Sequence, residues 1–318
     1  MSFSCVGHAT EFKLATLSPN GSSWMNNLRS AADEIGEKTD GRVSFKFYGG
    51  GVMGDDNVVL RKIRARQLHG GIVQTGPLSN QVPVVSLYNL PMKFQSFEEI
   101  KAVRSKYDET LITALRDRGF ETLGIPGLGF AYALSTKEAQ SLKKARNLKI
   151  WVPKGDRLSA RILNSFGINA VPLSPVDVLT GLQTGLIDTI AAPPVSVVAL
   201  QWHTQVSYLV DIPFMYIYSL FIVDSRRFNQ LSQEDQEVVR DVFKAAVALS
   251  EAQNIKDHQE TWEVLVSRGI EILTPNAAER KDWQLVASAG RQSWVDNGIV
   301  PEDVYEGMTN ILDEVRAN

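Results

Sequence analysis

The sequence predicts an α/β protein with two lobes, and three observations support this fold class. Residues 12–125 and 149–207 each alternate between strand-like and helix-like patterns, which is typical of sheets covered by helices. The glycine- and proline-rich segment 126–129 separates the two runs, so we expect a hinge there. Residues 233–266 favour helix almost throughout, and such a helix is about 50 Å long, enough to span both lobes.

The first lobe is expected to comprise residues 10–127 and 217–250. Turn residues in 18–21 and 40–41 separate its first three elements, and the apolar and polar residues of 43–48 alternate with the period of a strand. The expected elements are strand 12–17, helix 22–39, strand 43–48, helix 57–66, strand 71–74, helix 96–118 and strand 121–125.

The second lobe is expected to comprise residues 128–216 and 251–318, with a sheet of its own. Its alternating elements are strand 149–152, helix 157–166, strand 170–173, helix 176–184, strand 186–191 and helix 195–207. A strand at 219–223 follows Pro213, and then comes the long helix, whose apolar residues recur at helical spacing. Two further helices are expected at 277–297 and 301–315.

Charge and cysteine content exclude several classes of partner. The net charge is −3 with both signs scattered, so no basic stripe for nucleic-acid phosphates is present. The apolar stretches 195–200 and 245–249 are far shorter than the roughly 20 residues of a membrane span. A single cysteine, Cys5, excludes an internal disulfide and a site built from several thiolates.

Residues 1–9 are expected to be the remnant of a signal peptide or of a truncation close to it. Gly7-His8-Ala9 has the small-x-small form of a signal-peptidase site. This pattern indicates export from the cytoplasm, and we therefore expect the protein in the periplasm.

The segment Gly49-Gly50-Gly51-Val52-Met53-Gly54 satisfies the dinucleotide motif G-x-G-x-x-G, but its surroundings do not. About 20 residues further on, where an acid would bind a ribose hydroxyl, the chain reads Gly71-Ile72-Val73-Gln74-Thr75. Asp55 and Asp56 would repel a pyrophosphate and instead suit the N-terminus of the following helix. No nucleotide cofactor is expected.

Catalytic and metal-binding patterns are absent from the sequence. His8, His69, His203 and His258 are scattered, and neither H-E-x-x-H nor G-x-S-x-G occurs. We interpret His203 as a packed core residue and Asp188 as a hydrogen-bonded structural carboxylate. We expect no catalytic residue, no metal and no other cofactor, and hence no enzyme.

Several segments in a fixed order carry a family resemblance. In the first lobe they are residues 41–48, 49–54, 68–74 and Tyr88-Asn89-Leu90-Pro91-Met92-Lys93-Phe94. In the second lobe they are Asn147-Leu148-Lys149-Ile150-Trp151-Val152-Pro153, then Val171-Pro172-Leu173-Ser174, then Leu182-Gln183-Thr184-Gly185-Leu186-Ile187-Asp188. From Phe12 onward the chain resembles the DctP-type solute-binding proteins of TRAP transporters, whose second-lobe landmarks are K-x-R-x-P, V-P-x and L-Q-T-G-x-x-D.

The resemblance implies a periplasmic-binding-protein fold, in which two α/β lobes close on a ligand about a hinge and a long helix braces both. It also implies delivery of the ligand to a separate TRAP membrane permease. In most relatives the arginine of K-x-R-x-P clamps a substrate carboxylate, which makes the family chiefly a binder of organic acids. Here that position is Trp151, a second arginine position is Ala131, and a usual polar position before Pro193 is Ala192.

These replacements predict a site for an organic acid or for a more apolar, aromatic or neutral relative of one. Trp151 would stack on the ligand, Gln74 and Thr75 would provide hydrogen bonds, and Trp24 would close over it. Of the nearby aromatics, we expect Phe214 or Tyr216 to belong to the core. The candidate ligand-binding residues are Trp24, Gln74, Thr75, Ala131, Tyr132, Trp151, Pro175, Ala192, Phe214 and Tyr218.

Two other functional classes fit the sequence. One is an extracytoplasmic sensing module that reports a ligand to a receptor rather than to a permease. The other is an enzyme of doubly wound α/β fold, which would need titratable residues that converge on the cleft. The expected partners are a small-molecule ligand and the TRAP permease subunits, with no nucleic acid, and the expected state is a monomer.

Overall fold

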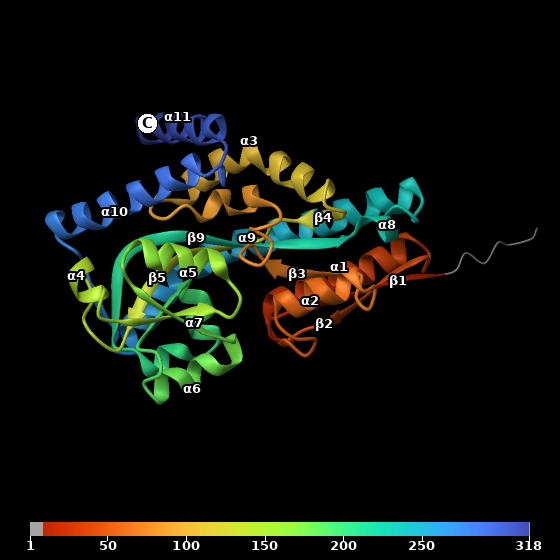
Figure 1. Cartoon of the computed structure of the whole chain (residues 1–318). Helices are drawn as coiled ribbons and strands as arrows, with labels where there is room; N and C mark the ends of the chain where they lie inside the picture. The colour runs from red at the N-terminus through yellow and green to blue at the C-terminus, as the bar shows by residue number, and fades with distance from the viewer. Residues whose placement is uncertain (1–8, 318) are drawn as a thin grey trace, which may run out of the picture. The chain divides into compact units, whose positions relative to one another are not determined.

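The computed structural model describes residues 9–317 and divides the chain into two compact units (Figure 1). Cys5 and most of the expected cleavage site Gly7-His8-Ala9 lie outside the described residues. Unit 1 takes in the chain up to Gln74 together with Ile112–Pro126 and Ser219–Ala252. Unit 2 comprises Thr75–Leu111, Gly127–Tyr218 and Gln253–Asn318. Residues 75–111, which we expected in the first lobe, therefore group with unit 2.

The sheet of unit 1 has the strand order β2-β1-β3-β9. β1 (Thr10–Thr16) runs parallel to β2 (Val43–Tyr48) and to β3 (Gly70–Gln74). β9 (Tyr208–Asp224) contributes its last residues and runs antiparallel to both β3 and β4 (Phe120–Gly124). The helices of this unit include α1 (Ser23–Lys38), α2 (Asp56–Arg64), α8 (Ser225–Phe228) and the first part of α9 (Gln233–Ser267).

The core of unit 1 is rich in phenylalanine. Phe243 of α9 is fully buried and contacts Phe45 and Phe221, each with a ring-centroid distance of 4.8 Å. Phe12 of β1 stacks on Phe45 at 5.1 Å. The apolar face of the first half of α9 is therefore fixed on the sheet of unit 1 by aromatic packing.

The sheet of unit 2 has the strand order β9-β5-β8-β6-β7, and β10 (Glu271–Leu273) also pairs with β9. β5 (Gly127–Ser135) is antiparallel to both β9 and β8 (Thr189–Ala192). β6 (Lys149–Pro153) is parallel to β8 and to β7 (Asn169–Leu173). The elements around this sheet are η1 (Pro83–Asn89), most of α3 (Phe97–Arg116), α4 (Leu142–Ala145), α5 (Arg157–Ser165), η2 (Pro175–Asp177), α6 (Val178–Gln183), α7 (Pro194–Ala199), η3 (Trp202–Gln205), α10 (Ala277–Asp296) and α11 (Glu302–Ala317).

The chain passes from unit 1 to unit 2 between Pro126 and Gly127, within the expected segment 126–129, and strand β5 begins there at once. Two expectations about the strands and helices were wrong. β9 is one strand of 17 residues that belongs to both ladders, so the units do not have wholly separate sheets. The helix expected at 195–207 ends at Ala199, because Gln201 adopts a left-handed conformation with φ of 59°.

No helix among residues 9–317 combines the length and the apolar character that a membrane span requires.

We expect the protein to lose stability as the pH falls below about 6.5, the ordinary pKa of histidine. The Nδ1 atom of His69 accepts a hydrogen bond of 3.0 Å from the Lys13 amide, so the ring must stay neutral at that atom. Burial, together with the charges of Arg227 and Lys13, lowers the pKa of His69. The unfolded chain therefore binds more protons below this pH, and the free energy of unfolding falls with it.

The measurement is urea unfolding at pH 7.5, 6.5 and 5.5 for the wild type and for His69→Asn. Asparagine keeps an acceptor for the Lys13 amide but does not titrate. We expect a shallower pH dependence in the variant, with the remaining slope due partly to His258, whose pKa is also lowered by burial. Identical slopes in both proteins would show that His69 is not the titrating group.

Candidate ligand-binding site

Three parallel strands of unit 2 end at the same edge of its sheet. β8, β6 and β7 lie side by side, and their carboxyl ends lead into α7, α5 and η2. Ligands of open α/β sheets bind at the carboxyl ends of the strands, where the loops and the helix N-termini supply polar groups. This edge of unit 2 is the candidate site, and we call it the unit 2 edge.

Trp151 lies on β6, two residues before the strand ends, and its indole is held by two contacts. The Nε1 atom donates a hydrogen bond of 3.0 Å to the Leu173 carbonyl of β7. The ring meets Trp202 of η3 edge to face, with a centroid distance of 5.1 Å. Trp151 is only 8% exposed. Because the only donor of its side chain is already used, it can offer a ligand the small exposed part of its ring but no hydrogen bond.

Tyr132 and Ala192 are opposite each other on β5 and β8, so they share one face of the sheet. The Tyr132 ring packs against Trp262 at 4.9 Å and against His258 at 5.8 Å, both on α9. Burial and Asp211 raise the pKa of Tyr132 to about 12, so its hydroxyl stays protonated at neutral pH. Ala131 is fully buried and pairs with Met215 of β9.

Of two further predicted aromatics in unit 2, Tyr218 is buried and Phe214 is half-buried. Tyr218 is buried, and its hydroxyl donates to the Val85 carbonyl. Phe214 packs against Phe166 at 5.1 Å and against Trp283 at 6.3 Å. Pro175 is half-buried and opens η2 directly after β7, at the unit 2 edge.

Thr75 also belongs to unit 2, and its hydroxyl is already engaged. It donates a hydrogen bond of 2.7 Å to the side-chain carbonyl of Asn89, whose amide donates in turn to the Tyr216 carbonyl at 2.8 Å. Thr75 is thus held in place by a buried network, and only its remaining acceptor capacity is free for a ligand.

The remaining two candidates, Gln74 and Trp24, belong to unit 1. The backbone N–H of Gln74 donates a hydrogen bond of 3.0 Å to the buried Asp56 carboxylate at the start of α2. Its side chain is half-buried at the carboxyl end of β3. Trp24 is half-buried in the first turn of α1 and packs on the core of the unit.

The glycine-rich segment 49–54 serves packing in unit 1. A Cβ on Gly49 would lie 2.5 Å from the side-chain oxygen of Asn20 and 3.0 Å from the Ser18 carbonyl oxygen, so a larger residue there would displace Asn20. The amides of Gly50 and Gly51 donate to the carbonyls of Ser18 and Thr16, which joins this loop to the loop after β1. Asp55 caps α2, as its position in the sequence predicted.

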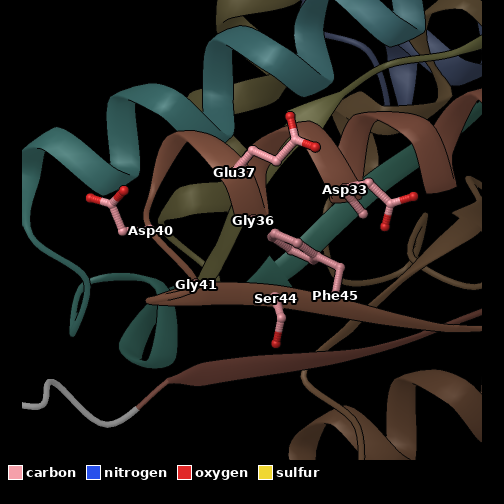
Figure 2. A pocket seen from close by; sticks show the side chains of 8 residues that line it. Asp33, Gly36, Glu37, Asp40, Gly41, Ser44 and Phe45 are labelled. Atoms are coloured by element: carbon pink, nitrogen blue, oxygen red, sulfur yellow. The ribbon is translucent and has the colours of Figure 1, made fainter.

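A shallow hollow of about 690 Å³ on unit 1 carries three carboxylates, from Asp33, Glu37 and Asp40. Figure 2 shows that these side chains point in different directions and do not converge on one point. Within the part of the chain that the structure describes, no group of three or more His, Cys, Asp or Glu side chains is placed to hold a metal ion.

Asp156 is the residue at the unit 2 edge that sequence reasoning missed. It follows β6 by three residues, caps α5 and is only 9% exposed. Burial raises the pKa of its carboxyl. In the sequence, Gly155-Asp156 signals only the start of a helix, and nothing in that pattern indicates burial.

The described residues form two α/β units, and each has parallel strands in its sheet. The sequence profile of the bacterial extracellular solute-binding protein family 7 (DctP) matches residues 14–294. The chain therefore belongs to this family, and the resemblance inferred from its motifs is confirmed.

Known relatives agree on the fold. A solute-binding protein of Chromohalobacter salexigens is 25% identical over 247 residues, which cover 77% of this chain and 70% of that protein. The Bordetella pertussis extracytoplasmic solute receptor DctP7, which binds pyroglutamic acid, has a TM-score of 0.86 and 18% identity over 96% of this chain and 100% of that one. A TRAP periplasmic solute-binding protein from Desulfovibrio salexigens with bound orotic acid has a TM-score of 0.84 and 18% identity. The match covers 96% of this chain and 99% of that one. The predicted fold class is thereby confirmed.

Proposed function

We propose that this protein is a periplasmic receptor that binds one small organic solute, without chemistry and as a monomer, and delivers it to a TRAP permease. Membership of an extracellular solute-binding family supports capture and delivery. The dispersed titratable groups support binding over catalysis, because acid-base chemistry needs two or more such groups within reach of one bound molecule.

One observation supports the class of ligand: an immobilised indole occupies the unit 2 edge at Trp151. An indole offers an apolar face, whereas a guanidinium would offer a charge-assisted, bidentate contact to a carboxylate. Ala131 and Ala192 add no charge. The ligand that fits is a ring-bearing or otherwise apolar organic solute, such as a cyclic organic acid or a neutral relative.

Cyclic ligands occur among the structural relatives. The proteins compared above bind pyroglutamic acid and orotic acid, each of which combines a ring with a carboxylate. At 18% identity these relatives share the fold with this chain. The side chains at the strand edges, rather than the fold, decide which ligand each protein binds.

A thermal-stabilisation screen against cyclic, aromatic, sugar-derived and dicarboxylic metabolites tests this proposal. A ligand at a hundred times its dissociation constant adds about 2.7 kcal/mol of stability, which raises the melting temperature measurably. Calorimetry on each hit, with and without a chelator, should give the same affinity because no metal takes part. Light scattering should give a mass near 35.2 kDa with and without ligand. A screen in which no solute stabilises the protein would contradict the proposal.

A further inference from the structure

We propose that Asp156 selects the ligand, favouring a group that donates a hydrogen bond, an amine or an alcohol, over a carboxylate at the same position. This inference rests on the proposed function and names the chemistry of its binding site. It is carried by the place of Asp156 at the unit 2 edge, by the contact of its carboxylate with Gly76, and by the absence of an ion pair at that carboxylate among the described residues.

Asp156 lies next to the predicted binding residues within unit 2. It belongs to the loop that follows β6, the strand of Trp151. Its carboxylate rests directly on Gly76, because a Cβ added to that glycine would be 2.2 Å from Oδ1 and 2.8 Å from Oδ2. Gly76 follows Thr75 in the chain, so the acid lies between the end of β6 and the segment that carries a predicted hydrogen-bonding residue.

Asp156 differs from four other buried acids because, among the described residues, its carboxylate makes no ion pair, although Lys154 and Arg157 lie near it in the sequence. The buried acids with an ion pair are Asp188 with Lys137 at 2.9 Å, Glu121 with Arg240 at 2.7 Å, Asp235 with Arg42 at 2.8 Å and Glu99 with Arg316 at 2.8 Å. Asp156 accepts only from Ser159, at 3.0 Å from the amide and 2.7 Å from the hydroxyl, and from the Leu158 amide.

With these contacts, the charged carboxylate is energetically unfavourable in its buried place, and it can still discriminate between ligand groups. Two carboxylate oxygens have about four acceptor positions, so capacity remains for a donor from a ligand. A buried carboxylate without a cation is unfavourable, and a ligand ammonium or hydroxyl would relieve that cost. A ligand carboxylate at the same point would add a second negative charge in a poorly solvated place, which is unfavourable. Helix capping explains an acid at this position, but it does not require burial against a glycine.

The test uses three probes that share one aromatic ring and differ in one polar group: benzylamine, benzyl alcohol and benzoate. Titration calorimetry at pH 7 should show that benzylamine and benzyl alcohol bind the wild type more tightly than benzoate does. Asp156→Asn should weaken benzylamine by about tenfold or more, since a charge-assisted hydrogen bond contributes about 1.5–3 kcal/mol. Asparagine is an equally good N-cap, so α5 should stay intact.

Two more variants separate the role in binding from the role in folding. Gly76→Ala keeps the charge but displaces the carboxylate, and it should reduce the preference for benzylamine in the same way as Asp156→Asn. Asp177→Asn is the matched control, because Asp177 is an exposed acid at the end of η2 and its side chain makes no capping hydrogen bond. Its removal should leave the order of the three probes unchanged. Melting temperatures and circular dichroism check that each variant is folded.

The proposal is overturned if wild-type protein binds benzoate more tightly than benzylamine and benzyl alcohol, or if Asp156→Asn changes neither affinity nor preference. Should all three probes bind too weakly to measure, the strongest solute from the thermal screen replaces them. An Asp156→Asn effect below threefold on that solute would then overturn the proposal. If the screen yields only carboxylates that carry no amine or hydroxyl group, selection by Asp156 fails while the receptor function stands, whereas a screen without any ligand contradicts the function itself.

Discussion

Replacing Trp151 by alanine is expected to weaken the ligand by about 1–3 kcal/mol, or roughly 5- to 150-fold in dissociation constant. The indole is held by Leu173 and Trp202, so its ring is already oriented before a ligand arrives. Alanine removes both the contact surface and this preorganisation. Titration calorimetry with the strongest ligand from the screen measures the loss, and a thermal melt verifies that the variant is folded.

Two companion substitutions distinguish stacking from simple filling of space. Trp151→Phe keeps an aromatic face and should recover most of the affinity. Trp151→Arg should shift preference toward carboxylates, although Ala131 and Ala192 leave that site incomplete. The interpretation fails if the wild type binds a plain dicarboxylate tightly through another cation, for which the exposed Arg157 and Arg161 of α5 are the first to test.

Phe243→Ala is expected to lower the free energy of unfolding by about 3–5 kcal/mol. The side chain is fully buried between β2 and β9, where it meets Phe45, Phe47 and Phe221. Its removal leaves a cavity among rigid rings that cannot close around it. Chemical denaturation followed by circular dichroism gives the change in stability.

Leu249 offers a matched control on the same helix. It is 64% exposed, so Leu249→Ala should change stability by less than about 0.5 kcal/mol. If the two variants are destabilised equally, helix propensity rather than core packing would explain the loss, and the assignment of Phe243 to the core of unit 1 would be wrong.

Much of the secondary structure follows from local sequence. The helix expected at 22–39 is Ser23–Lys38, and the one expected at 233–266 is Gln233–Ser267, because cap residues and helical periodicity mark such ends. The strand at 43–48 is reproduced without change. These elements have one apolar and one polar face, and this pattern is visible in the sequence alone.

The strands that join the units were harder to predict. Gly127 and Gly129 indicate a loop, yet both lie in β5, where pairing with β9 overrides their local preference. Pro213 suggests a break, yet it lies inside β9 where the register with β5 is irregular and no regular ladder bond is required. Pairing between strands that are distant in the sequence determines the conformation at all three residues, and it cannot be predicted from the local sequence.

The candidate site was predicted in part. Motif order placed Trp151, Ala192 and Pro175 on strands or loops that end at the unit 2 edge. It could not show that the indole donor of Trp151 is satisfied by Leu173, because that bond joins residues 22 positions apart. Asp156 was missed for the same reason, since its contact with Gly76 exists only in the folded chain.

The division of unit 1 among three stretches of chain has a consequence for biosynthesis. Its β3 pairs with residues 219–223 of β9, so the nascent chain must retain an unpaired strand edge while the next 150 or so residues are made. Phe243, which completes the aromatic core, emerges later still. Neither unit is a contiguous segment of the chain, so neither can fold independently before the other has been synthesised. Folding is therefore expected to begin only when nearly the whole chain is available, and to be slow because the contacts that close unit 1 are distant in sequence.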